Sequence, residues 1–63
     1  MTLEQYSKVY LNQRVKFLWA NDSLKGNFGY VVKKYNGNYQ CLVWFDGETK
    51  PRVVGYKLLE SID

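Results

Sequence analysis

The sequence contains no histidine, which removes the commonest catalytic base and the commonest metal ligand of proteins. Its single cysteine, Cys41, excludes an internal disulfide framework and a cluster of thiolate metal ligands. A nucleophile elbow and a phosphate-binding glycine loop are also missing, and the acidic residues are scattered. We therefore expect no enzyme activity, no catalytic or metal-binding residue, no cofactor and no small-molecule substrate.

Long apolar runs are missing as well. No run approaches the roughly 18–20 residues that a membrane span needs. The first residues, 1–5, lack the basic and apolar regions of a signal peptide, and the lone cysteine gives no sign of an oxidising compartment. These features predict a cytoplasmic protein without a membrane partner.

The charge of the chain is only mildly biased. The chain has nine basic and six acidic residues, so its formal net charge is +3. An excess of this size suits a polyanion and an acidic protein surface equally, so charge alone does not choose between these partners.

Aromatic residues are abundant, at 17% of only 63 residues. A domain this small buries only about 60% of the surface of its unfolded chain. Because each aromatic side chain buries about 150–250 Å², these residues must supply much of the core of one domain, residues 1–63.

Hydrophobic periodicity divides the chain into a helix followed by strands. Thr2 and Gln5 have capping-box spacing and predict a helix over residues 2–11, with an apolar stripe of Leu3, Tyr6 and Tyr10. From Val15 the pattern alternates, which is typical of strands and predicts that Val15, Phe17 and Trp19 share one face, turned toward the core. The predicted strands are Val15–Trp19, Phe28–Tyr35, Tyr39–Phe45, a short one near Arg52–Val54, and Leu59–Ile62.

Turn-forming residues separate these strands. Residues 20–27 read as a loop, and Asn36-Gly37-Asn38 predicts a hairpin in which Asn-Gly adopts positive φ. Asp46-Gly47 predicts the next hairpin, and Pro51 should start the fourth strand. Residues 55–58 read as a single helical turn. Five short strands with tight turns predict a mostly β, closed or nearly closed barrel over residues 15–62, with the helix at its N-terminal end.

The order of these features resembles SH3-like small β-barrels of the Tudor and KOW kind. The resemblance rests on Gly29-Tyr30-Val31-Val32, Leu42–Gly47, Val53-Val54 and Leu58-Leu59. It covers about residues 15–62, and the N-terminal helix departs from the minimal five-stranded pattern. Such barrels bind methylated side chains, nucleic acids, proline-rich peptides or protein surfaces, so the fold does not choose a function.

The third strand offers one candidate binding surface. If Cys41, Val43 and Phe45 face the core, Leu42 and Trp44 face outward. Either the helix covers this pair, or the pair is exposed as a contact surface, or a register slip buries Trp44. The candidate protein-binding residues are Leu42, Trp44, Tyr56 and Tyr30.

Basic residues interleaved with tyrosine offer a second candidate surface, because single-stranded nucleic acids bind through phosphate charge and base stacking. The candidate nucleic-acid-binding residues are Lys33, Lys34, Tyr35, Lys50 and Arg52. The alternative interpretation is a solvated face whose lysines protect an edge strand, while Tyr35 and Tyr39 pair across the hairpin. A cage for a methylated cation, formed by Trp19, Tyr30, Phe45 and Asp46, is a third possibility.

Two functions follow from these surfaces. The first is a non-enzymatic protein-interaction module, such as a small regulator or inhibitor of a larger, nucleic-acid-processing partner. A small single domain without catalytic groups is typical of many accessory proteins of bacteria and bacteriophages. The alternative is direct binding of RNA or DNA through a basic and aromatic face of the barrel. The high aromatic content and small charge excess favour the interaction module.

Overall fold

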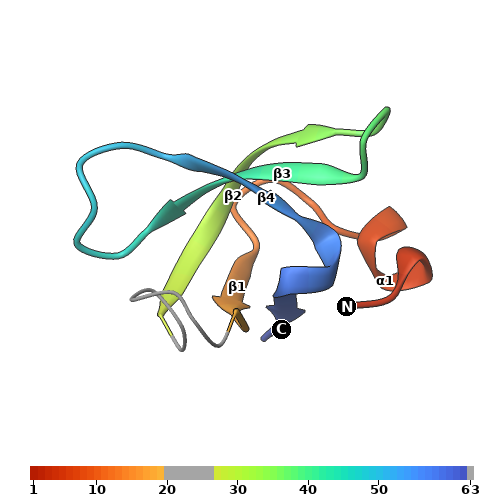
Figure 1. Cartoon of the computed structure of the whole chain (residues 1–63), viewed down its shortest axis with the longest axis horizontal. Coiled ribbons are helices and arrows are strands. Elements are labelled where there is room, and N and C mark those ends of the chain that lie inside the picture. Colours follow the sequence, from red (N-terminus) through yellow and green to blue (C-terminus); the bar gives the residue numbers. More distant parts are fainter. Residues whose placement is uncertain (20–26, 63) are drawn as a thin grey trace.

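The computed structural model describes residues 1–19 and 27–62, which form a short helix and five strands (Figure 1). The elements are α1 (Leu3–Ser7), β1 (Arg14–Phe17), β2 (Phe28–Tyr35), β3 (Gln40–Phe45), β4 (Arg52–Gly55), the 3₁₀ turn η1 (Tyr56–Leu58) and β5 (Leu59–Ser61). The order of elements predicted from the sequence is therefore confirmed. The predicted loop over residues 20–27 falls mainly outside the described residues.

The strands form one antiparallel sheet in the order β4-β3-β2-β1-β5. Consecutive strands pair from β1 to β4, and the 3₁₀ turn returns the chain so that β5 pairs with the far side of β1. In the described parts of the chain, no ladder joins β4 to β5, so the sheet is not closed by strand pairing. A small β-barrel-like fold is consistent with this sheet, whereas the predicted closure is not observed.

The core lies on one side of the sheet and follows the predicted alternation. Val15 and Phe17 of β1 and Cys41, Val43 and Phe45 of β3 are all buried. The remaining buried apolar residues are Tyr6, Val9, Val31, Val54 and Leu59. The prediction for Trp19 is wrong, because β1 ends at Phe17 and the alternation ends with it, leaving Trp19 47% exposed.

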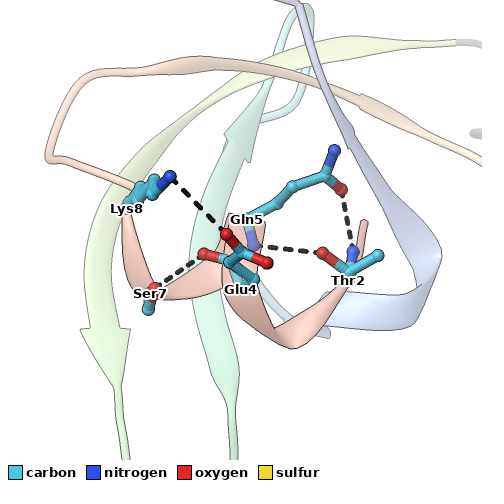
Figure 2. A network of polar contacts seen from close by, with 5 residues as sticks. All are labelled: Thr2, Glu4, Gln5, Ser7 and Lys8. Carbon is cyan, nitrogen blue, oxygen red and sulfur yellow. Dashed lines mark hydrogen bonds and ion pairs between the residues drawn. The ribbon is translucent and has the colours of Figure 1, made fainter.

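Helix α1 is much shorter than the predicted helix over residues 2–11. The capping box is confirmed: Thr2 Oγ1 accepts from the amide of Gln5, and the Gln5 side chain accepts from the amide of Thr2 (Figure 2). The chain leaves the helix after Ser7 and reverses at Asn12, whose φ is +72°. The predicted stripe does not form, since Leu3 and Tyr10 are about half exposed while Tyr6 and Val9 are buried.

A bulge in β2 changes which side of the sheet its residues face. Val31 pairs with Val43, but Lys33 pairs with Leu42, so Val32 is an extra residue in the ladder. Val31 and Lys34 therefore face the core side, whereas Lys33 and Tyr35 face the opposite side. A strict alternation along β2 would have given the reverse assignment for the two lysines.

The two hairpins differ in where the backbone adopts positive φ. Gly47 has a φ of +84°, as Asp46-Gly47 predicted. In the first hairpin the residue with positive φ is Tyr39, at +53°, so the prediction for Asn-Gly is wrong. Residues 36–39 all belong to this turn, and Tyr35 consequently pairs with Gln40 instead of Tyr39.

Candidate functional site

The side of the sheet that faces away from the core, called here the outer face, brings aromatic, apolar and basic side chains together. Residues that pair directly in an antiparallel ladder present their side chains on the same side of the sheet. The side chains of the outer face are those of Arg14, Lys16, Phe28, Tyr30, Lys33, Tyr35, Gln40, Leu42, Trp44, Val53 and Glu60. Candidates for protein binding and for nucleic-acid binding thus share one surface.

The centre of the outer face is the cross-strand pair of Tyr30 and Trp44. The two residues are register partners on β2 and β3, and both are only partly buried. The indole N–H of Trp44 donates to the main-chain oxygen of Glu48 at 2.9 Å, which fixes one edge of the ring. The rest of this aromatic pair presents a pre-ordered apolar surface.

Apolar side chains extend the surface beside this pair. Leu42 is partly buried, and its register partner on β4, Val53, is 54% exposed. Helix α1 does not cover them: its one buried side chain, Tyr6, joins the core cluster on the opposite side of the sheet. The interpretation in which the helix covers Leu42 and Trp44 is therefore wrong, and so is the register slip.

Tyr56 is not part of the outer face. Its ring packs against those of Tyr6 and Tyr39, with centroid separations of 5.9 Å and 6.3 Å. The Tyr6 and Tyr39 rings are 6.2 Å apart and nearly perpendicular, so the three tyrosines form one cluster. This cluster joins the helix to the hairpin of β2 and β3 and to η1.

The candidate basic residues are dispersed. Lys33 lies on the outer face, with its ammonium group 5.2 Å from the ring centroid of Tyr35. Lys34 lies on the other side, where its ammonium group donates to the main-chain oxygens of Tyr6 and Val9. Arg52 is the register partner of Val43, on the core side, and pairs with Glu48 at 3.2 Å. Lys50 is exposed in the turn before β4. The structure does not gather them into one patch.

Arg14 anchors the edge of the outer face to the second hairpin. Its guanidinium donates two hydrogen bonds to the carboxylate of Asp46, at 3.0 Å and 2.7 Å. These hydrogen bonds hold the pKa of Asp46 below its usual value. The residues proposed for a methylated-cation cage do not converge, because Tyr30 lies on the outer face and Phe45 in the core.

The phenol of Tyr6 and the thiol of Cys41 lie together on the core side of the sheet. Burial, with a smaller contribution from Cys41, raises the pKa of Tyr6 to about 12. Burial also raises the pKa of Cys41, which keeps the thiol protonated and unreactive. This pair is therefore part of the core.

The candidates drawn from the sequence did not include six residues of the outer face, namely Arg14, Lys16, Phe28, Gln40, Val53 and Glu60. Alternation along β1 places Lys16 opposite Val15 and Phe17, which is a usable signal. Arg14 lies two residues before Lys16 on β1, so the same alternation places it on this side, whereas Val53 joins the face through its register partner Leu42, and register cannot be read from one strand alone.

In the described ranges, no helix is long and apolar enough to span a membrane. The same residues contain no group of three or more Cys, Asp or Glu side chains that could hold a metal ion. No protein-family model matches the chain, and no curated protein sequence matches it significantly.

Proposed function

We propose that this chain is a non-enzymatic protein-interaction module that docks a protein partner on its outer face. The observation that carries the proposal is the partly exposed pair of Tyr30 and Trp44, held in register at the centre of a sheet face that α1 does not cover. Tryptophan and tyrosine dominate the energetics of protein interfaces.

The surroundings of the pair support the same function. Leu42 and Val53 add apolar area beside the aromatic rings, and the basic residues Lys33 and Arg14 adjoin this area as the register partners of Leu42 and Tyr30. Aromatic residues and arginine are enriched at protein interfaces. By size, the chain suits a small regulator or inhibitor of a larger partner, such as a nucleic-acid-processing protein.

Affinity purification with nuclease treatment tests this function. The wild-type chain should retain a protein partner after nuclease digestion, and Trp44→Ala should lose it. Trp19→Ala is the matched control, because it removes the other tryptophan, which is exposed beyond the end of β1. Equal retention by both variants, or no retained partner, contradicts the proposal.

Direct binding of single-stranded nucleic acid is the second candidate. It is favoured by Lys33 over the ring of Tyr35, on the same face as Tyr30 and Trp44. Fluorescence anisotropy with a labelled oligothymidylate at low salt measures it directly. Binding that weakens with salt and with Lys33→Glu supports this candidate; no binding at low salt excludes it.

A further inference from the structure

A cleft of about 320 Å³, with mixed apolar and polar lining, runs along β4. All of β4 (Arg52–Gly55) lines it, together with Phe17, Gln40, Phe45 and Leu58. Val53 and Val54 point to opposite sides of the sheet, yet both border the cleft. The cleft therefore follows the edge of the strand and does not lie over one face of the sheet.

The main chain of β4 is paired on one side only. β4 is the last strand in the sheet order, and its partners are residues Gln40–Val43 of β3. No other strand of the described chain pairs with its far side. An edge strand presents main-chain N–H and C=O groups that can pair with an incoming extended segment. Beside this edge, the Phe17 and Phe45 rings form an apolar wall, with centroids 5.5 Å apart.

The charge at the cleft selects among possible occupants. Arg52 is the charged side chain among the described lining residues; it is about half exposed and pairs with Glu48. Lys50 lies two residues earlier in the chain, and the whole molecule carries a net charge of +3. A second copy of the chain would bring the same excess of positive charge, so an acidic segment of another protein is the better complement.

We propose that the edge of β4 binds an extended segment of a partner protein by strand addition. One apolar side chain of the segment enters the cleft against Phe17 and Phe45, and an acidic side chain lies beside Arg52. The added strand is short, because β4 has four residues and Pro51, which cannot donate a hydrogen bond, precedes it. This site shares Gln40 and Val53 with the border of the outer face, but Phe17, Phe45, Val54 and Leu58 lie outside that face, and the site does not include the pair of Tyr30 and Trp44.

Gly55 provides a way to block the cleft. Its φ is −69°, which any residue can adopt, and a Cβ added there meets no atom within 4 Å. Gly55→Trp should therefore fill the end of the cleft without straining the backbone. Circular dichroism and the thermal midpoint verify that this variant is folded.

A selection of random heptapeptides displayed on phage tests the proposal, with the wild-type chain as target and Gly55→Trp for counterselection. We expect the selected peptides to share an apolar residue close to an acidic one. Their amide chemical-shift perturbations should concentrate in β4, Phe17 and Leu58. Arg52→Glu should weaken binding about fivefold. Lys33→Glu makes the same charge change on the outer face and should leave binding unchanged, so this pair of variants remains decisive even if Gly55→Trp does not fold.

Three kinds of result would overturn the proposal. The first is a failure of selective binding: either no peptide is enriched on the wild-type chain over the counterselection target, or Arg52→Glu and Lys33→Glu weaken binding equally. The second is that the selected peptides perturb Trp44 and Tyr30 instead of β4. The third is a dimer in sedimentation velocity that Arg52→Glu or Gly55→Trp dissociates, which would assign the edge to a second copy of the chain.

Discussion

The ammonium group of Lys34 lies over the ring of Tyr6, 4.8 Å from the ring centroid, and donates a hydrogen bond of 3.0 Å to the main-chain oxygen of the same residue. A second hydrogen bond, of 3.1 Å, reaches the main-chain oxygen of Val9. Helix α1 has no basic residue in its own last turn, so Lys34 supplies from β2 the cation that stabilises a helix C-terminus. A side chain of the sheet thus holds the helix in place.

Replacing Lys34 by methionine should destabilise the fold, because the variant keeps the apolar stem but loses both hydrogen bonds and the contact with the Tyr6 ring. Hydrogen bonds that involve a charged group contribute about 1.5–3 kcal/mol, so we expect a loss of about 2 kcal/mol in the free energy of unfolding. Lys33→Met is the matched control and should change that free energy by less than about 0.5 kcal/mol. Urea unfolding measures both; equal effects of the two variants would contradict the structural role of Lys34.

The phenol of Tyr6 should make stability depend on alkaline pH. Its pKa is about 12 in the folded chain and 10.0 ordinarily, and the titratable side chains around it include Cys41, Lys34, Tyr39 and Tyr56. Because the folded pKa is raised, the corresponding stability is fully present below pH 10 and is lost as the pH rises toward about 12.

Tyr6→Phe should remove this part of the alkaline loss. The variant should also be less stable by about 1 kcal/mol at neutral pH, because the Gln40 main-chain oxygen loses its 2.6 Å hydrogen bond from the phenol. Thermal unfolding of both proteins from neutral to alkaline pH gives the comparison. Parallel curves for the two proteins above pH 10 would show that Tyr6 does not titrate in this way.

Gly29 should tolerate no side chain. A Cβ built there lies 2.7 Å from the main-chain oxygen of Trp44 and 2.9 Å from Cγ1 of Val43. Since the nearest atom is rigid backbone in the paired strand, Gly29→Ala should cost about 1–3 kcal/mol of unfolding free energy.

Gly37→Ala provides the comparison for that substitution. A Cβ at Gly37 meets no atom within 4 Å, so the variant should be neutral or up to about 1 kcal/mol more stable. In chemical denaturation, the unfolding midpoint of Gly29→Ala should therefore lie below that of the wild type, and the midpoint of Gly37→Ala should equal or exceed it. A wild-type midpoint for Gly29→Ala would refute the close approach of β2 to β3.

The ion pair of Arg14 and Asp46 should contribute to the acid sensitivity of the chain. The hydrogen bonds from Arg14 lower the pKa of Asp46 from its ordinary value of 3.8. The stability that depends on the carboxylate is therefore present above pH 3.8 and is lost as the pH falls through the lower, folded-state pKa. Asp46→Asn should lose less stability than the wild type between about pH 5 and about pH 2. A pH titration of the melting temperature tests this, with Glu60→Gln, at an exposed carboxylate of β5, as the comparison.

The local patterns of the sequence predicted most of the fold. Alternation placed Val15, Phe17 and Cys41 in the core, and the capping box placed the start of α1. The errors arose where the outcome depends on tertiary contacts. The end of α1 is set by the reversal at Asn12, and the turn before β3 is set by Tyr39, whose ring is held by Tyr6 and Tyr56.

The candidate site was predicted only in part, for the same reason. Tyr30, Leu42 and Trp44 were singled out from composition and alternation, and register brings them together on the outer face. Lys34 and Tyr56 were singled out on the same grounds but are engaged in holding the helix and the tyrosine cluster. Residue type alone does not distinguish a lysine that binds a partner from one that binds its own chain.

Because of the bulge at Val32, Lys33 lies on the outer face, whereas Lys34 lies on the core side and binds α1. If Val32 instead paired as an ordinary strand residue, Lys33 would turn to the core side, and Lys34, which now reaches α1, would turn to the outer face. The extra residue therefore decides which of the two lysines holds the helix and which is presented to a partner. A shift of register in β2 would change the attachment of the N-terminal segment and the charge of the binding surface together.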